Sequence, residues 1–282
     1  MQTKLIIHGG FFSESSTSAE VKLQKQQALQ HIVKTAYDYL QTHTALQTVV
    51  YAVELLENDP LFNAGLGSQI QSDGKIRMSA SIMDGTTQKF SGVINIENIQ
   101  NPIRVAEQLM TYDDRVLGGE GAIQFAIANN HPFYNVELPQ RRGEYEQKLK
   151  AKALGTVGCV ALDATGKIAA ATSTGGKGFE MVGRISDSAT AAGNYANAYC
   201  GISCTGVGED IVSGAVATKI VTRVTDGFTI AKAFAKTFVE LIPYDGFAGA
   251  IGIDAQGTIF HQDSHPSMVF ASYDGEQIDV FN

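Results

Sequence analysis

The chain has 282 residues, a formal net charge of −8 at pH 7 and a pI of about 5.2; 44% of its residues are hydrophobic and 18% are charged. This length and composition support a buried core and exclude an intrinsically disordered chain. No apolar run approaches the roughly 18 residues of a membrane-spanning helix, and the most basic stretch, 141–152, is interrupted by glutamates. We therefore expect neither a membrane partner nor a nucleic-acid partner.

The N-terminus and the cysteines indicate a cellular compartment. The apolar run near the N-terminus is three residues long, too short for a signal peptide. Cys159, Cys200 and Cys204 are an odd number of cysteines at no metal-ligand spacing. We expect a cytoplasmic protein with reduced, buried thiols.

The first half of the chain predicts strands and helices in alternation. Residues 3–8 are predicted to form a strand that ends at His8-Gly9-Gly10, and apolar residues at three-to-four spacing predict a helix over about 18–41. Thr44 followed by Gln47 is the capping-box signal of a second helix. The other predicted elements are a helix at 45–58, a hairpin at 67–83 turning at 72–74, a strand at 91–97, and helices at about 102–110 and 120–129.

The second half begins after a charged stretch, 131–152, which lacks apolar periodicity and is predicted to be a linker. Two similar hairpins follow, one over 156–173 and one over 246–261, each with the turn pattern Asp-Ala-x-Gly. Between them the pattern predicts a strand near 201–204 and helices at about 210–224 and 229–241. Runs of strands beside runs of helices indicate two sheets covered by helices.

Three segments combine glycine with small polar residues inside otherwise apolar elements. They are 62–68, then 155–158 leading to 172–176, and then 183–187 leading to 204–206. Each alone is typical of an ordinary turn. Together, and in this order, they mark the candidate site.

These segments resemble the plant-type asparaginase and isoaspartyl peptidase family of N-terminal nucleophile hydrolases. The resemblance extends from His8-Gly9-Gly10 to the hairpin at 246–261, and its motifs include GTVGCVALD (155–163), AAATSTGG (169–176), GRISDS (183–188) and SCTGVGE (203–209). It implies an α+β fold, a four-layer αββα sandwich, formed by one domain over 1–282. It also implies a homodimer of processed units that acts on asparagine or on isoaspartyl dipeptides.

The resemblance assigns the reacting groups. It implies that the chain is cut between Gly155 and Thr156, giving chains of 155 and 127 residues. Thr156 then supplies both the hydroxyl nucleophile and a free α-amine. Thr174 is expected to hydrogen-bond within the nucleophile cluster, and Asn63 is expected near the nucleophile.

The resemblance also assigns substrate-binding groups and an ion. Thr205 and Gly206 are implied as the oxyanion hole and as substrate contacts, Arg184 as the partner of the substrate α-carboxylate, and Asp187 as the partner of its α-ammonium. No cofactor is implied for the chemistry. A structural sodium ion is implied in a loop that binds it through backbone carbonyls, at Leu56, Glu57, Asp59, Phe62, Ala64 and Leu66.

The chemistry of these residue types supports the assignment independently. A threonine hydroxyl needs a base to take its proton, and an α-amine with a pKa of about 7.7–8 is suited to that near neutral pH. This base exists only after the preceding peptide bond is cut. A hydroxyl and a backbone N–H, as in Thr205-Gly206, supply two donors for an oxyanion, and the planar fork of an arginine matches a carboxylate.

The chain departs from the family pattern in places that bear on the substrate. Phe11 and Phe12 follow the His-Gly-Gly motif, where the family has small residues, and are expected to crowd the pocket. Ser186 and Ala189 replace a glycine and a proline, and 262–268 differs from the family's usual segment.

Two alternatives to this function remain. One is a glycosylasparaginase-like hydrolase, which is less favoured because the chain lacks paired cysteines and a secretory signal. The other is an unprocessed, non-catalytic relative that binds a small amino acid.

Overall fold

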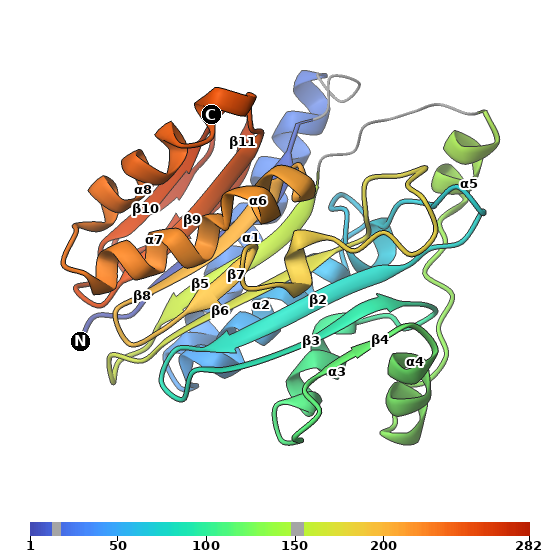
Figure 1. Cartoon of the computed structure of the whole chain (residues 1–282), viewed down its shortest axis with the longest axis horizontal. Helices are drawn as coiled ribbons and strands as arrows, with labels where there is room; N and C mark the ends of the chain where they lie inside the picture. Colours follow the sequence, from blue (N-terminus) through green and yellow to red (C-terminus); the bar gives the residue numbers. More distant parts are fainter. Residues whose placement is uncertain (13–17, 148–154) are drawn as a thin grey trace.

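Two β-sheets packed face to face between layers of helices form the centre of the molecule, a computed structural model that describes residues 1–12, 18–147 and 155–282 (Figure 1). In this part of the chain the larger sheet has eight strands in the order β12-β11-β1-β5-β6-β2-β3-β4. They are β1 (Lys4–Phe11), β2 (Met78–Asp84), β3 (Lys89–Ile96), β4 (Val116–Gly118), β5 (Thr156–Leu162), β6 (Ile168–Thr174), β11 (Met268–Tyr273) and β12 (Ile278–Val280). The pair β3–β4 is parallel and the other neighbours are antiparallel.

The smaller sheet has four described strands in the order β10-β9-β8-β7, namely β7 (Asn194–Ala196), β8 (Cys200–Gly206), β9 (Ala248–Asp254) and β10 (Ile259–Asp263). Strand β8 packs on β5 and β6. At Gly201 an added Cβ would stand 2.7 Å from a methyl of Ile168 and 3.0 Å from one of Val160, so glycine allows this close approach. Strands β5 and β6 are buried along their whole length because a sheet covers one face and helices cover the other.

Helices form the two outer layers. Helices α1 (Ala19–Leu40), α2 (Ala45–Glu57) and α3 (Pro102–Leu109) pack on the larger sheet, while α7 (Val216–Thr225) and α8 (Ile230–Val239) pack on the smaller one (Figure 1). The remaining helices described are α4 (Gly119–Ala128), α5 (Pro139–Glu146) and α6 (Gly208–Gly214). None of the described helices is both long and apolar enough to cross a membrane.

The predicted four-layer αββα sandwich is confirmed, and so are most elements. Ser18 caps α1, and Thr44 with Gln47 forms the predicted capping box of α2. The two similar hairpins are β5–β6 in one sheet and β9–β10 in the other. The three cysteines are buried and free.

The predicted hairpin at 67–83 is wrong. A turn does close there, with Gln71 N–H donating to the carbonyl of Lys75, but the flanking residues do not pair as strands. Gln69 and Ser72 instead donate backbone bonds to the segment 175–180, and β2 pairs with β3. Alternating isoleucines and a turn therefore indicated local pairing where the real partner lies more than 100 residues away.

Two other expectations need correction. The helix predicted at 210–224 is two helices, α6 and α7, because Ala215 takes a left-handed conformation (φ 47°, ψ 44°) between them. The predicted linker 131–152 contains α5, whose residues Arg141 and Arg142 pair with Glu144 and Glu137. Its last residues, 148–152, lie outside the described part of the chain.

Candidate active site

The candidate nucleophile Thr156 is the first residue of β5 and lies directly opposite Thr174, the last residue of β6. Their hydroxyl oxygens are 3.4 Å apart, with Thr156 donating to Thr174. Thr156 is 5% exposed and Thr174 is 3% exposed. The pairing of β5 with β6 therefore holds the two hydroxyl groups together, buried from solvent.

The carbonyl of Gly155, the group just before Thr156, receives two hydrogen bonds. Asn63 Nδ2 donates from 2.7 Å and Thr174 Oγ1 from 3.3 Å. A Cβ on Gly155 would stand 2.9 Å from the Cβ of Asn63, so this approach needs glycine. Both donors pull electron density from the carbonyl that a Thr156 hydroxyl would attack.

A buried histidine holds the other side of Thr156. Burial lowers the pKa of His8 to about 3, so the ring is neutral. The carbonyl of Thr156 can only accept, so His8 Nδ1, 2.9 Å away, carries the proton and donates it. His8 Nε2 then accepts from the Ser203 hydroxyl at 2.9 Å, and Thr172 donates to Ser203 at 2.7 Å. His8 therefore fixes the carbonyl of Thr156 from the neighbouring strand β1.

Thr205 and Gly206 end β8, which faces the strand of Thr156. Thr205 is fully buried, and its hydroxyl bonds to none of the described residues. Gly206 has φ +134°, and an added Cβ would stand 2.5 Å from the carbonyl oxygen of Phe247. Most buried polar groups have a hydrogen-bond partner, whereas the Thr205 hydroxyl keeps an unused donor.

Arg184 and Asp187 both border Gly208, the first residue of α6. A Cβ there would stand 2.6 Å from Arg184 Nη2 and 2.8 Å from Asp187 Oδ1. Arg184 is held by Glu209, through Nε and Nη2 at 3.1 Å each, and Lys177 reaches Glu209 at 3.1 Å. The sequence reasoning missed Glu209, although it lies inside the motif at 203–209.

Asp187 is an unusual carboxylate. It is 2% exposed, burial raises its pKa to about 6, and its Oδ2 atom has no partner among the described residues. Ser186, a departure from the family pattern, donates to Asp187 Oδ1 at 3.1 Å. Its Oδ1 atom is held by Ser186, and its Oδ2 atom lies against Gly193, where an added Cβ would stand 2.5 Å from it.

The loop from Leu56 to Leu66 tests the expected sodium ion. Glu57 is fully buried with its carboxyl group turned toward Ser173 and the backbone N–H of Ile103, at 2.6 and 3.2 Å. Burial raises the pKa of this carboxyl to about 8. The carboxyl group of Glu57 is therefore engaged by Ser173 and Ile103, while its backbone carbonyl and Cβ lie against Gly65.

The backbone of this loop has the right chemistry for a hard cation, which takes oxygen ligands. A Cβ on Gly65 would stand 2.2 Å from the carbonyl oxygen of Glu57, and one on Gly67 would stand 1.8 Å from that of Phe62. The carbonyls of Leu56, Asp59, Phe62 and Ala64 accept hydrogen bonds inside the loop, and each keeps a second lone pair. The structural sodium ion in this loop stays a prediction.

The loop after the first strand is only partly as expected. Phe11 is 3% exposed and packs beside Phe247, on the side of Thr205. Phe12 turns the other way, onto Phe281, with the ring centroids 5.1 Å apart. Crowding of the pocket therefore concerns Phe11 and not Phe12.

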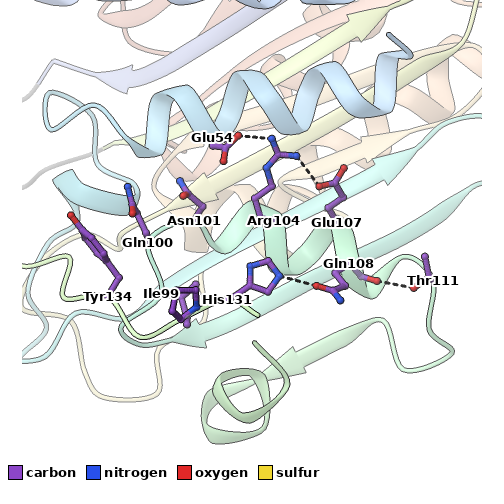
Figure 2. A pocket seen from close by; sticks show the side chains of 11 residues that line it. Glu54, Ile99, Gln100, Asn101, Arg104, Glu107, Gln108, Thr111, His131 and Tyr134 are labelled. Atoms are coloured by element: carbon purple, nitrogen blue, oxygen red, sulfur yellow. Dashed lines mark hydrogen bonds and ion pairs between the residues drawn. The ribbon is translucent and has the colours of Figure 1, made fainter. Parts of the chain in front are cut away.

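A separate cavity of about 660 Å³ lies beside α2 and α3 (Figure 2). Arg104 bridges Glu54 and Glu107 there, and His131 bonds to Gln108 at 2.8 Å. None of the site residues predicted from the sequence lines this cavity. The charged side chains of this cavity pair with one another. The candidate active site is therefore the cluster around Thr156.

The chain is similar to known proteins over nearly its whole length. The sequence profile of the family described as Asparaginase matches residues 1–281. The chain belongs to this family. The isoaspartyl peptidase/L-asparaginase of Synechocystis sp. is 45% identical, over 99% of this chain and 90% of the relative. The chain is also similar to the isoaspartyl peptidase of Escherichia coli, 36% identical over 90% of this chain and 88% of the relative, and to the plant-type L-asparaginase of Pyrococcus abyssi, 34% identical over 90% and 91%.

Proposed function

We propose that the chain cuts itself between Gly155 and Thr156 and that the freed Thr156 hydrolyses isoaspartyl dipeptides and L-asparagine, releasing aspartate. The observation that carries this proposal is the pair of donors, Asn63 and Thr174, on the carbonyl of Gly155. The start of an ordinary strand does not require two hydrogen-bond donors on the preceding carbonyl. It also does not require a glycine at that position beside a buried threonine hydroxyl.

Self-cleavage begins with attack of Thr156 Oγ on the Gly155 carbonyl carbon. Thr174 accepts a hydrogen bond from Thr156 and donates one to the Gly155 oxygen, so one side chain supports both the nucleophile and the developing oxyanion. The C–N bond breaks, the nitrogen takes the proton and becomes the α-amine of Thr156, and an ester remains. Water then hydrolyses the ester to the Gly155 carboxylate and a free Thr156 hydroxyl.

Substrate hydrolysis uses the same oxygen atom. The α-amine of Thr156 takes the hydroxyl proton while Oγ attacks the side-chain carbonyl of the substrate. The oxyanion receives bonds from the Thr205 hydroxyl and the Gly206 N–H, which satisfies the Thr205 group that is otherwise without a partner. Ammonia or an amino acid leaves with a proton from the ammonium, and water releases aspartate from the resulting ester.

The substrate is anchored by its α-groups. Asp187 receives the α-ammonium, and Arg184 receives the α-carboxylate through Nη1, while Glu209 holds Nε and Nη2. Glu209 thus fixes the orientation of the Arg184 guanidinium toward the substrate. A structural sodium ion in the loop 56–66 and a homodimer of processed units belong to the same proposal.

Activity assays on purified, aged protein test this function. The parent should release ammonia from L-asparagine and cleave isoaspartyl dipeptides, whereas Thr156→Ala should stay intact and inactive. Thr156→Ser keeps the hydroxyl and should retain cleavage, more slowly because serine lacks the methyl group that restrains χ1. Binding of aspartate by an intact, inactive parent would favour the non-catalytic alternative, and selective release of glycosylamine-linked aspartate would favour the glycosylasparaginase alternative.

A further inference from the structure

Three aromatic rings form a row that starts in the core and ends at the surface. The rings belong to Phe11, Phe247 and His265. Phe11 meets Phe247 edge-on, with the centroids 4.6 Å apart, and Phe247 stacks on His265 at 4.6 Å with an interplanar angle of 17°. Phe11 is nearly buried, whereas Phe247 and His265 are partly exposed.

The buried end of the row lies beside the candidate oxyanion hole. A Cβ on Gly249 would stand 2.8 Å from Cζ of Phe11, so the ring fills the place of a Gly249 side chain. Gly249 pairs with Thr205 between β9 and β8, and paired residues of antiparallel strands project to the same face. The Phe11 ring and the Thr205 hydroxyl therefore share one face of the smaller sheet.

The backbone of Phe247, whose ring is the middle of the row, lies beside Gly206. The carbonyl oxygen of Phe247 stands 2.5 Å from the place of a Gly206 Cβ, and it accepts the N–H of Val207 at 2.9 Å. The groups proposed to bind the α-end of the substrate, Arg184 and Asp187, border Gly208. A substrate held at that end with its carbonyl at Gly206 would place its scissile bond on the face of the smaller sheet that carries Thr205 and the Phe11 ring.

We propose that Phe11, Phe247 and His265 form a leaving-group subsite that selects isoaspartyl dipeptides whose second residue has an apolar or aromatic side chain. This inference rests on the proposed function. The partly exposed Phe247 offers an apolar surface to that side chain, and Phe11 closes the inner end of the surface. An aromatic side chain gains edge or offset contacts there, and a methyl side chain is too short to make them.

The outer ring adds a polar contact. His265 Nδ1 lies 3.0 Å from the Ser264 hydroxyl, which also accepts the N–H of Ala248. His265 Nε2 bonds to no described residue and is free to donate to the carboxylate at the dipeptide's C-terminus. Asparagine, whose leaving group is ammonia, reaches none of these rings.

The experiment compares kcat/KM for isoaspartyl-phenylalanine, isoaspartyl-leucine, isoaspartyl-alanine and L-asparagine. The variants are Phe247→Leu and His265→Ala. If Phe247→Leu fails to cleave itself, His265→Ala still tests the subsite. Phe12→Ala is the matched control, because Phe12 packs on Phe281 and away from the row. All proteins are checked for complete self-cleavage before assay.

The parent should prefer the phenylalanine dipeptide over the alanine dipeptide by roughly tenfold or more, within the 10–200-fold that an apolar contact supports. That ratio should fall at least threefold, on the order of 0.7 kcal/mol, in both variants and should stay unchanged in Phe12→Ala. Equal kcat/KM for the three dipeptides, or the parent ratio in both variants, overturns the subsite alone. No hydrolysis of any of these substrates by a parent that stays intact overturns the proposed function, and the subsite with it.

Discussion

Replacing Thr205 with valine should move activity and stability in opposite directions. The Thr205 hydroxyl is fully buried and bonds to no described residue, and burying such a group costs about 1–3 kcal/mol. Valine keeps the shape and removes that cost, so the free energy of unfolding should rise, or at least not fall. The same change removes one donor to the oxyanion, which should lower kcat by roughly 10²–10³, or about 2.7–4 kcal/mol.

Steady-state kinetics on L-asparagine and urea unfolding of the processed protein measure the two effects. Thr237→Val is a matched control, because that buried hydroxyl is satisfied, donating to Ala233 and accepting from Arg223 at 2.7 and 2.6 Å. The control should lose stability, about 0.5–1.5 kcal/mol, and keep its kcat. A loss of kcat below threefold in Thr205→Val, or a loss of stability as large as in the control, would refute the assigned role of this hydroxyl.

Three further changes test the groups around the nucleophile. The Arg184→Lys variant should process itself normally. Its kcat/KM should fall by the equivalent of roughly 1.5–3 kcal/mol, because one ammonium group cannot bind Glu209 and the substrate carboxylate at once. An unchanged kcat/KM would remove Arg184 from the site. The kcat/KM profile should fall as the Thr156 α-amine gains its proton and should fall more steeply below about pH 6, since protonation of Asp187 removes the charge that pairs with the substrate ammonium; Asp187→Asn should lack this steeper part, and a parent profile without it contradicts the assignment. His8→Asn retains a donor near the position of Nδ1 and should keep more of kcat than His8→Gln, whose amide reaches toward Ser203; equal kcat values for the two variants would count against an effect through the Thr156 carbonyl.

The sequence was most informative where the chemistry depends on neighbours in the chain or on strand pairing. Gly155 and Thr156 are adjacent, and the apolar strands around them predict the β5–β6 hairpin that brings Thr174 opposite Thr156. Asn63 was placed near the nucleophile through the resemblance alone. Its bond to the Gly155 carbonyl joins residues 92 apart in the chain, which no local pattern predicts.

The sequence was least informative where distant segments meet. Residues 69–72 bond to 175–180 instead of folding into their own hairpin, because the buried backbone groups of 69–71 need hydrogen-bond partners and the segment 175–180 lies alongside them. Glu209 lies inside the motif at 203–209, but its hydrogen bonds with Arg184 depend on how α6 follows β8 in space. The row of Phe11, Phe247 and His265 gathers three parts of the chain and has no sequence signal beyond an unusual Phe-Phe pair.

The mass of the purified protein tests the central claim, that Thr156 becomes an N-terminus, most directly. The reasoning rests on a Gly155 carbonyl polarised by Asn63 and Thr174 beside the Thr156 hydroxyl. Intact-mass analysis of aged protein should show chains of 155 and 127 residues, the second beginning Thr-Val-Gly-Cys, with activity rising as they accumulate. A fully active preparation that contains only the 282-residue chain would contradict this account.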